Sequence, residues 1–384
     1  MKMRDTTKQF SLSILYVATL LALFAPRMMN PEWNFDSVVY VAAAQKDGFE
    51  TREEWHTAAY ESVAQVADKT AFRKIIKGSQ YRKQLHQNPE YFETQLPFYR
   101  SKITYVTLIR AMDALGVNPA TASHLISTAS IVSLGLLAVL WMGVGGLNVW
   151  VFGAALCLMF TTPFRLAVGF SNPDPLCAAL ICWGLYTIRH GRKPLWGIAW
   201  MTLAVLTRAD AWMMVAILLL WLYGSNGTIL SRRGAVGGWL VSLGALGTVM
   251  LVTKPYAWGV VAQHTFVKKL YKPGEMDQTI AFGDYLNALW RGAMGDYHLH
   301  PTALGSFLFL SVVAVGWVTI RKRDVHQTPS IHLIGVAWIC AILHFLIFPS
   351  LNDRFYLATY FIVACESISL LWASPTKEPS THPQ

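Results

Sequence analysis

The sequence has few charged residues. Asp, Glu, Lys and Arg together make up 14% of the 384 residues, whereas 54% are hydrophobic. Soluble domains carry roughly 25% charged residues, so the composition argues against an ordinary soluble domain. The apolar residues lie in continuous runs, and helices can satisfy their own backbone hydrogen bonds within lipid. The sequence therefore predicts an all-α, polytopic integral membrane protein.

Several common catalytic and nucleotide-binding motifs are absent. The sequence contains no HExxH, no P-loop, no GxSxG and no GxGxxG that follows a strand. Without these motifs there is no sign of a nucleotide-binding domain. If the protein is an enzyme, its activated donor is therefore expected to come from the membrane. The five cysteines have no CxxC spacing and lie in apolar segments, where they are interpreted as packing residues.

The connections between the apolar segments alternate in charge. Arg and Lys cluster at the start of the chain and within residues 189–193, 232–233 and 321–323. Cytoplasmic loops collect Lys and Arg, so these connections are predicted to lie inside. The same topology, with contact to anionic lipid, explains the net charge of +10, and no nucleic-acid partner is predicted. The outer connections then carry Asp36, Asp174, Asp210, Asp284, Asp296 and Asp353.

About ten apolar segments are predicted to cross the membrane, which places both termini in the cytoplasm of a bacterial-type inner (plasma) membrane. The first follows a basic start like a signal peptide, but no small-residue cleavage site comes after it, so it is interpreted as an uncleaved span. Four consecutive segments are shorter than the roughly 20 residues that crossing takes, which predicts polar helix ends around a wet outer cavity. The ten are residues 10–26, 120–142, 149–162, 176–188, 195–207, 211–223, 235–252, 302–320, 331–348 and 355–373.

Residues 1–374 are predicted to form a single transmembrane domain with two long outer segments. The first outer loop, residues 27–119, is rich in helix formers, and residues 102–115 have the apolar spacing of an interfacial amphipathic helix. The second outer segment covers residues 253–301. Residues 375–384 are predicted to form a disordered cytoplasmic tail.

Asp36 lies shortly after the first predicted span, in the sequence Asn34-Phe35-Asp36-Ser37. A carboxylate just outside the membrane can remove a proton from an acceptor hydroxyl or bind a divalent cation. It can also serve as the N-cap of a helix through residues 38–44, and the two roles are compatible. Both interpretations stay open at this residue.

Two further outer acids lie at predicted helix starts. Asn172, Pro173 and Asp174 are typical of an N-cap followed by the first turn, and Asp174 would contact sugar or metal if it faced the cavity. Arg208 precedes Asp210 by two residues. This spacing suits an Arg–Asp pair that neutralises a buried turn, or an arginine that binds phosphate.

Arg354 begins the last predicted span on the outer side, where a cation opposes the helix macrodipole. A partner is therefore expected, either Asp353 or a bound anion. The lysines within residues 268–272 are expected to meet lipid headgroups, with the phosphate of a lipid carrier as the alternative.

The remaining polar residues have simpler structural interpretations. Asp296, His298 and His300 have a spacing that suits a metal, but such a pattern in a loop is more often a surface feature, and no metal ligand is assigned. His344 and Glu366 lie in apolar segments, where polar contacts between packed helices are expected.

The order of these features resembles the GT-C-type glycosyltransferases, polytopic enzymes that use lipid-phosphate-linked sugars. An acid follows the first span, and the large outer loop ends in an aromatic and basic segment, residues 97–105. The turn at residues 206–210 resembles the family's Leu-Thr-Arg-Pro-type turn, with Ala209 in place of the proline. Residues 353–356 resemble its Arg-Tyr-type start of a C-terminal span, whereas the paired carboxylates of the family's first outer loop are reduced here to Asp36.

The resemblance implies transfer of a sugar from a polyprenyl-phosphate-linked donor to an envelope acceptor at the outer face, with inversion. The acceptor, a glycan, lipid or protein, and the requirement for a divalent cation stay open. The implied roles are Asp36 as general base, Arg208, Arg354, Arg100 and Lys102 as donor-phosphate ligands, and Asp174, Asp210, Asn172 and Tyr40 as residues that bind or orient the sugar.

Two functions of other classes remain as alternatives. A lipid or solute transporter or flippase also uses short helices with charges at half depth, but transporters commonly contain two related halves, and no internal repeat is found. A non-catalytic scaffold for an envelope assembly predicts that the outer acids can be changed freely.

Overall fold

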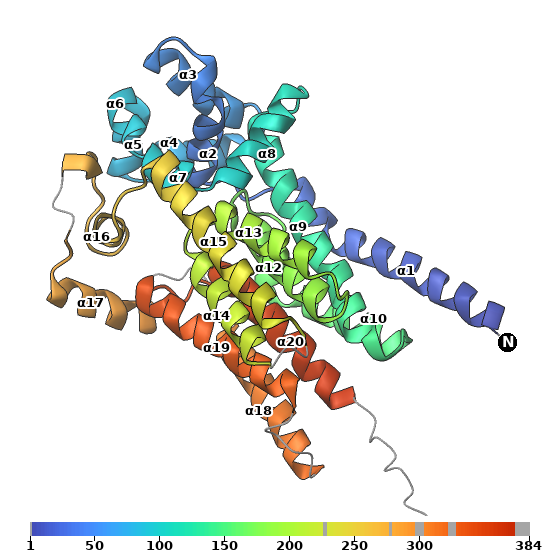
Figure 1. Ribbon diagram of the computed structural model, residues 1–384. Helices are drawn as coiled ribbons and strands as arrows, with labels where there is room; N and C mark the ends of the chain where they lie inside the picture. Colours follow the sequence, from blue (N-terminus) through green and yellow to red (C-terminus); the bar gives the residue numbers. More distant parts are fainter. Residues whose placement is uncertain (1, 226–228, 276–278, 296–302, 322–327, 373–384) are drawn as a thin grey trace, which may run out of the picture.

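Every regular element in the described part of the chain is helical, which confirms the all-α prediction. The computed structural model describes residues 2–225, 229–275, 279–295, 303–321 and 328–372. Most of the apolar helices run side by side in one bundle, and α1 projects away from the others (Figure 1). These helices are α1 (Lys2–Met29), α9 (Pro119–Met142), α10 (Val149–Phe160), α11 (Thr162–Ala167), α12 (Asp174–Arg189), α13 (Pro194–Thr207), α14 (Ala211–Gly224), α15 (Arg232–Thr253), α18 (Leu304–Ile320), α19 (Pro329–Ile347) and α20 (Leu357–Trp372).

Five helices are long and apolar enough to cross a membrane. They comprise Ser11–Met29, Pro119–Met142, Arg232–Thr253, Pro329–Ile347 and Asp353–Trp372. Each of the ten predicted apolar segments lies largely within one helix, but α10, α13, α14 and α18 are shorter apolar helices. A membrane-embedded helical bundle is therefore supported, while the count of ten spans exceeds the five that length and composition establish among the described residues.

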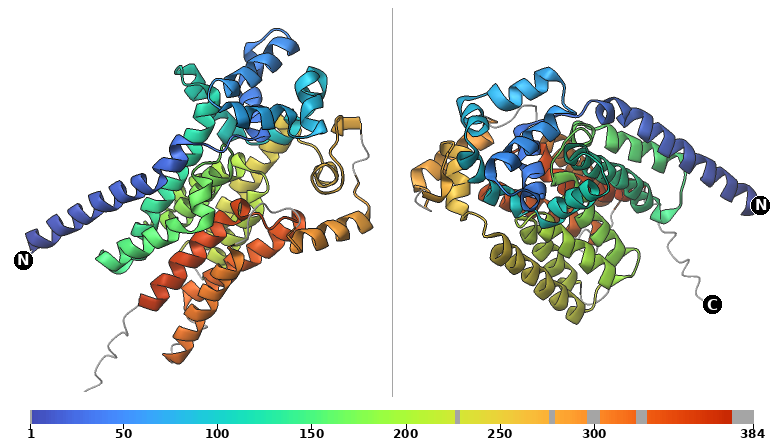
Figure 2. Two further views of the ribbon diagram at one scale, coloured as in Figure 1. Left: turned by 180° about the vertical axis from the view of Figure 1, so that it is seen from behind. Right: turned by 90° about the horizontal axis from the view of Figure 1, so that it is seen from above.

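Seven helices form a separate cap at one end of the bundle (Figures 1 and 2). They have a hydrophobic core of their own, in which Trp55, Phe92 and Tyr105 are almost fully buried. A helix at the predicted position, α8, ends the cap. The cap helices are α2 (Phe35–Gln45), α3 (Arg52–Ala64), α4 (Lys69–Lys77), α5 (Gln80–Gln87), α6 (Pro89–Glu93), α7 (Leu96–Arg100) and α8 (Ile103–Ala114).

Residues 256–271, in the first part of the segment between α15 and α18, contact the cap. The segment contains α16 (Trp258–Ala262), a π-helical turn (Gln263–Val267) and α17 (Phe282–Ala293). Gln95 of the cap donates to the carbonyl oxygen of Tyr271 at 3.4 Å, and Tyr256 donates to that of Thr94 at 2.9 Å. These contacts hold the second segment against the first.

Helices α12 and α13 approach each other closely at two glycines. A Cβ atom on Gly184 would lie 2.9 Å from the carbonyl oxygen of Gly197, and one on Gly197 would lie 2.7 Å from that of Gly184. Small residues at helix interfaces permit this close backbone packing. The tight pair fixes the turn at residues 208–210 against the start of α12.

Three predictions fall on residues outside the described ranges. They concern the metal-like spacing of Asp296, His298 and His300, the basic residues 322–323, and the tail at residues 375–384.

Candidate functional site

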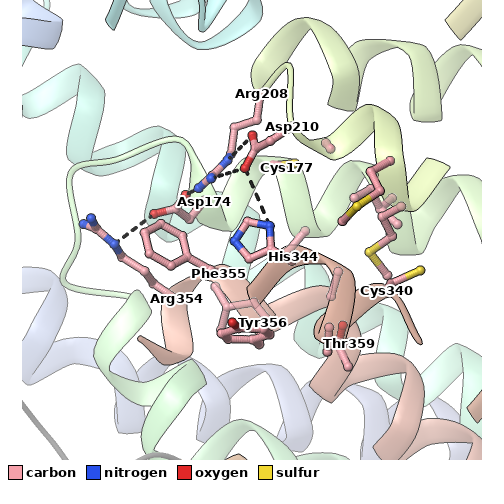
Figure 3. Close-up of a pocket in the computed structure, with 18 residues that line it drawn as sticks. Asp174, Cys177, Arg208, Asp210, Cys340, His344, Arg354, Phe355, Tyr356 and Thr359 are labelled. Carbon is pink, nitrogen blue, oxygen red and sulfur yellow. Dashed lines mark hydrogen bonds and ion pairs between the residues drawn. The ribbon is translucent and has the colours of Figure 1, made fainter. Parts of the chain in front are cut away.

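Residues from four distant parts of the sequence form one continuous chain of contacts between polar side chains, and Figure 3 shows the part of it that runs from Arg354 to His344. From Asp36 to Asp210, carboxylates and guanidinium groups alternate, so each of these charges contacts an opposite one, and the ring of His344 follows Asp210 at the end. In the order of contact, the members of the chain are Asp36, Arg354, Asp174, Arg208, Asp210 and His344. The chain lies where the cap meets the starts of α12, α14 and the last helix.

Asp36 lies in the first turn of α2 and faces away from the capping contacts. The N-cap is Asn34, whose side chain accepts from the backbone N–H of Ser37, so the interpretation of Asp36 as the cap is wrong. Its Oδ1 accepts a 2.7 Å hydrogen bond from the hydroxyl of Tyr99, and its Oδ2 lies 3.7 Å from Arg354. The two contacts fix the orientation of the carboxylate toward the chain of charges.

Tyr99 is held in a cluster of aromatic rings. The ring of Tyr40 lies 5.0 Å from that of Tyr99 and 5.1 Å from that of Tyr105, both in edge-on geometry. Burial, followed by the negative charge of Asp36, raises the pKa of Tyr99 well above its usual value. The hydroxyl therefore stays protonated and remains a hydrogen-bond donor to Asp36.

Asp174 is the central carboxylate in this series of contacting side chains and is only 5% exposed. It contacts Arg208 through Oδ1 and lies 3.5 Å from Nε of Arg354 through Oδ2. Helix α12 begins at Asp174, one residue later than the predicted Asn172–Pro173 start, and Asn172 instead accepts from the backbone N–H of Asp174 at 3.2 Å. Asp174 therefore joins two arginines that are far apart in sequence.

Asn172 is itself buried beside these charges. Its main chain is held by Ser127 of α9, whose hydroxyl donates to the carbonyl oxygen of Asn172 at 2.7 Å. Its side-chain nitrogen is buried and has no hydrogen-bond partner in the described part of the chain. A buried donor without a partner is costly, and a ligand that accepts this hydrogen bond would remove the cost.

Arg208 makes the Arg–Asp pair that its spacing predicts. Its Nε donates to Asp210 Oδ1 at 3.0 Å, and a second nitrogen donates to Oδ2 at 2.5 Å. His344 of α19 extends the chain, with Nδ1 at 3.8 Å from Asp210 Oδ2. The structural interpretation of Arg208 is therefore confirmed, and its further contact with Asp174 connects the pair to Arg354.

Arg354 has carboxylate partners other than the expected Asp353. It lies beside Asp36 and Asp174, whereas Asp353 accepts hydrogen bonds from Tyr360 at 2.8 Å and from the backbone N–H of Ala303 at 3.0 Å. Of the two expected partners, Asp353 is wrong, and the bound anion stays a prediction. Two acids from distant segments therefore explain why a cation lies at this helix start, where it opposes the helix macrodipole.

One aromatic ring packs against both guanidinium groups. The centre of the Phe355 ring lies 5.0 Å from the guanidinium carbon of Arg208 and 4.8 Å from that of Arg354. The π face of an aromatic ring attracts cations at such distances. Phe355 therefore helps to keep two like charges close together.

A cavity of about 310 Å³ opens beside these residues, between the cap, the bundle and the segment after α15. Seven of the nine predicted site residues line it, namely Asp36, Tyr40, Lys102, Asn172, Asp174, Arg208 and Arg354. Its cationic lining consists of Lys102, Arg208, Lys269 and Arg354, twice the number of its carboxylates. The excess of positive charge suits an anion.

The remaining predicted residues differ in their relation to this cavity. Asp210 contacts the cavity only through Arg208 and lines a smaller adjoining pocket with His344. Arg100 does not line it, although its neighbours Tyr99 and Ser101 do. The prediction for Arg100 is therefore not supported by its position.

Lys102 and His264 differ in charge at neutral pH. Burial, followed by the nearby Arg208, lowers the pKa of Lys102 to about 8, so the ammonium group is mostly charged at pH 7. Burial, followed by Lys269, lowers the pKa of His264 to about 3, so this ring is neutral. Lys102 can attract an anion, and His264 can only donate or accept hydrogen bonds.

Within the described ranges, no three His, Cys, Asp or Glu side chains lie close enough together to hold a metal ion. Asp36 and Asp174 are instead occupied by arginines and by Tyr99. The divalent cation that the sequence left open therefore has no ligand set among these residues.

Three residues of the site were not assigned to it from the sequence. Tyr99 lies inside the aromatic and basic segment at 97–105, and His344 lies in an apolar segment and was assigned to helix packing. Phe355 follows Arg354 directly. An unusual polar residue in an apolar helix was the available signal for His344, but its contact with Asp210 depends on the packing of α14 against α19.

No family model matches the chain, and comparison with curated proteins and with solved structures finds no significant match.

Proposed function

We propose that the protein is a membrane glycosyltransferase that transfers a sugar from a polyprenyl-phosphate-linked donor to an envelope acceptor. In this proposal ten spans place the cap, and the cavity beneath it, on the outer face of the inner membrane. The donor enters the cavity from the bilayer. The supporting residues are Asp36, Lys102, Arg208 and Arg354, which line the cavity together although they lie in distant parts of the sequence.

The observation that carries the proposal is a base and an anion-binding group on one cavity wall. Oδ2 of Asp36 lies 3.7 Å from a terminal nitrogen of Arg354. Transfer from a sugar phosphate needs a proton acceptor near the acceptor hydroxyl and positive charge near the departing phosphate. A cavity that offers both within a few ångströms suits this class of reaction.

In the proposed mechanism, Asp36 accepts the proton of the acceptor hydroxyl as its oxygen attacks the anomeric carbon. The bond between that carbon and the phosphate oxygen breaks, and the phosphate leaves with its electron pair. Attack from the opposite side inverts the anomeric centre. Tyr99 orients Asp36 through the 2.7 Å hydrogen bond.

The developing charge on the phosphate is stabilised by Arg354, Arg208 and Lys102, which line the cavity. Both arginines already contact Asp174, so the donor phosphate shares them with a carboxylate instead of meeting free cations. This sharing keeps the arginines in place before the donor arrives, which reduces the reorganisation that accompanies the reaction. Asn172 adds its unpartnered side-chain N–H groups as donors to the sugar.

Purified protein in liposomes, given a radiolabelled polyprenyl-phosphate sugar and membrane extract, tests the proposal. We expect label in a new product, and we expect Asp36→Asn to reduce turnover by about 10²–10⁴-fold with donor binding retained. Asp47→Asn is the matched control, because Asp47 also lies beside an arginine, Arg110 at 3.0 Å, but is 75% exposed and outside the cavity. Unchanged turnover in Asp36→Asn would exclude Asp36 as the base, and label that only crosses the liposome would indicate a transporter.

A further inference from the structure

A second and larger cavity, of about 440 Å³, lies at the end of the bundle opposite the cap. It is bounded by the C-terminal ends of α9, α12 and α20 and by the first residues of α10 and α19. Figure 1 shows these helix ends pointing away from α2–α8. None of its lining residues belongs to the candidate site.

The floor of this cavity contains a buried ion pair. Glu366, 1% exposed, accepts hydrogen bonds from Arg189 and, at 2.7 Å, from the indole N–H of Trp141. A second guanidinium nitrogen of Arg189 donates to the hydroxyl of Ser330 at 3.1 Å. One positive and one negative charge thus lie side by side on the cavity wall. The guanidinium group of Arg189 has further N–H donors besides those that bind Glu366 and Ser330.

The same wall holds a polar atom that lacks a partner. Nε2 of His190 is buried, and it has no hydrogen-bond partner among the described residues. Because His190 lines the cavity beside Arg189, a ligand in the cavity can supply the missing hydrogen bond.

The rim of the cavity is apolar and exposed, in contrast to the floor. Trp150 is 71% exposed, and Trp372 and Val144 are also exposed at the rim. In a membrane-embedded bundle, exposed tryptophans at helix ends are typical of the boundary between lipid tails and headgroups. A charged floor below an apolar rim suits an amphiphile whose polar end enters the cavity and whose tails remain outside.

We propose that this cavity binds the headgroup of a zwitterionic phospholipid. The phosphate of the headgroup lies against Arg189 and His190, and its ammonium group lies against Glu366 and the tryptophan rings. The adjacent opposite charges match a headgroup that carries both signs, whereas an anionic headgroup would leave Glu366 facing a second negative charge. This inference does not depend on the proposed glycosyl transfer.

Native mass spectrometry of the detergent-purified protein with added phosphatidylethanolamine, phosphatidylcholine or phosphatidylglycerol tests the site. We expect the two zwitterionic lipids to bind at least about tenfold more tightly than phosphatidylglycerol, since each charge-assisted hydrogen bond discriminates by at least that factor. Phosphatidylglycerol that binds as tightly as the others, or the absence of any retained lipid, would overturn the proposal.

Two variants locate the binding. Glu366→Gln removes the carboxylate and leaves Arg189, so the preference should shift toward phosphatidylglycerol, which a merely structural role of the pair would not produce. Trp150→Ala alters only an exposed side chain and should weaken the zwitterionic lipids several-fold, even if Glu366→Gln does not fold. Trp196→Ala is its control, because Trp196 is 64% exposed at the start of the neighbouring α13 but does not line the cavity. Equal losses in the two tryptophan variants would argue against this site.

Discussion

Replacing Asp174 by Asn should destabilise the protein strongly, although the side chain keeps its shape. Asp174 is 5% exposed and contacts Arg208 and Arg354, which are 15% and 27% exposed. Removing one partner of a buried ion pair typically costs about 3–5 kcal/mol, because the other charge is left uncompensated. Here Arg208 keeps Asp210 and Arg354 keeps Asp36, so we expect a loss near the lower end, about 3 kcal/mol.

The free energy of unfolding can be measured by titration with SDS in mixed micelles, with the helical signal as the readout. The control is Asp47→Asn, which also removes a carboxylate from an arginine, but at 75% exposure. Exposed ion pairs contribute about 0–1 kcal/mol, so the control should change little. Equal losses in the two variants would refute the conclusion that buried Asp174 neutralises two partly buried arginines.

Three further predictions follow from individual contacts. The pKa of Lys102 is about 8, so its charge is present below that value and is lost as the pH rises through it. The KM for the donor should therefore rise above pH 8, and Lys102→Arg should abolish this rise; an unchanged pH profile would remove Lys102 from the donor site. Tyr99→Phe removes the 2.7 Å hydrogen bond to Asp36 and should reduce kcat about tenfold with an intact fold. A kcat equal to that of the unmodified protein would contradict an orienting role of Tyr99. Gly184→Ala should cost about 1–3 kcal/mol of stability, because its Cβ would meet the backbone of α13. Gly153→Ala is the control and should cost nothing, because there is open space around Gly153. Equal thermal unfolding temperatures of the two variants would show that α12 and α13 can separate freely.

The sequence was a good guide to which acids and arginines lie together, because charge is conspicuous in an apolar chain. Asp36, Asp174, Arg208 and Arg354 do share one cavity, as the outer placement of these residues predicted. Their pairing was not predictable in the same way. Arg354 contacts two acids that precede it by more than 170 residues, and only the packing of the helices decides that these, rather than the adjacent Asp353, are its partners.

Most helix starts were predicted to within two residues, but α1 begins eight residues and α15 three residues before the predicted segments, and the role of each residue at a start was less secure. The sequence analysis considered Asp36 as the N-cap, although Asn is an equally good N-cap residue. The structure selects Asn34, because Ser37 completes a capping box with it, and Asp36 is left to contact Tyr99. The family resemblance grouped Arg100 with Lys102, but only Lys102 lines the cavity, because Arg100 ends α7 and Lys102 precedes α8.

Helix α9 belongs to both hydrophobic cores of the molecule. Ala120 and Ile126 pack among the cap helices, whereas residues from Ile131 onward pack in the bundle. Between them, the fully buried hydroxyl of Ser127 donates a hydrogen bond to the carbonyl oxygen of Asn172, and Ser127 does not line the cavity. One helix therefore contacts both the cap, which carries Asp36, and the residues that precede Asp174 at the start of α12. A genetic screen for inactive proteins should accordingly recover bulky replacements at Ser127, a position that no substrate would ever touch.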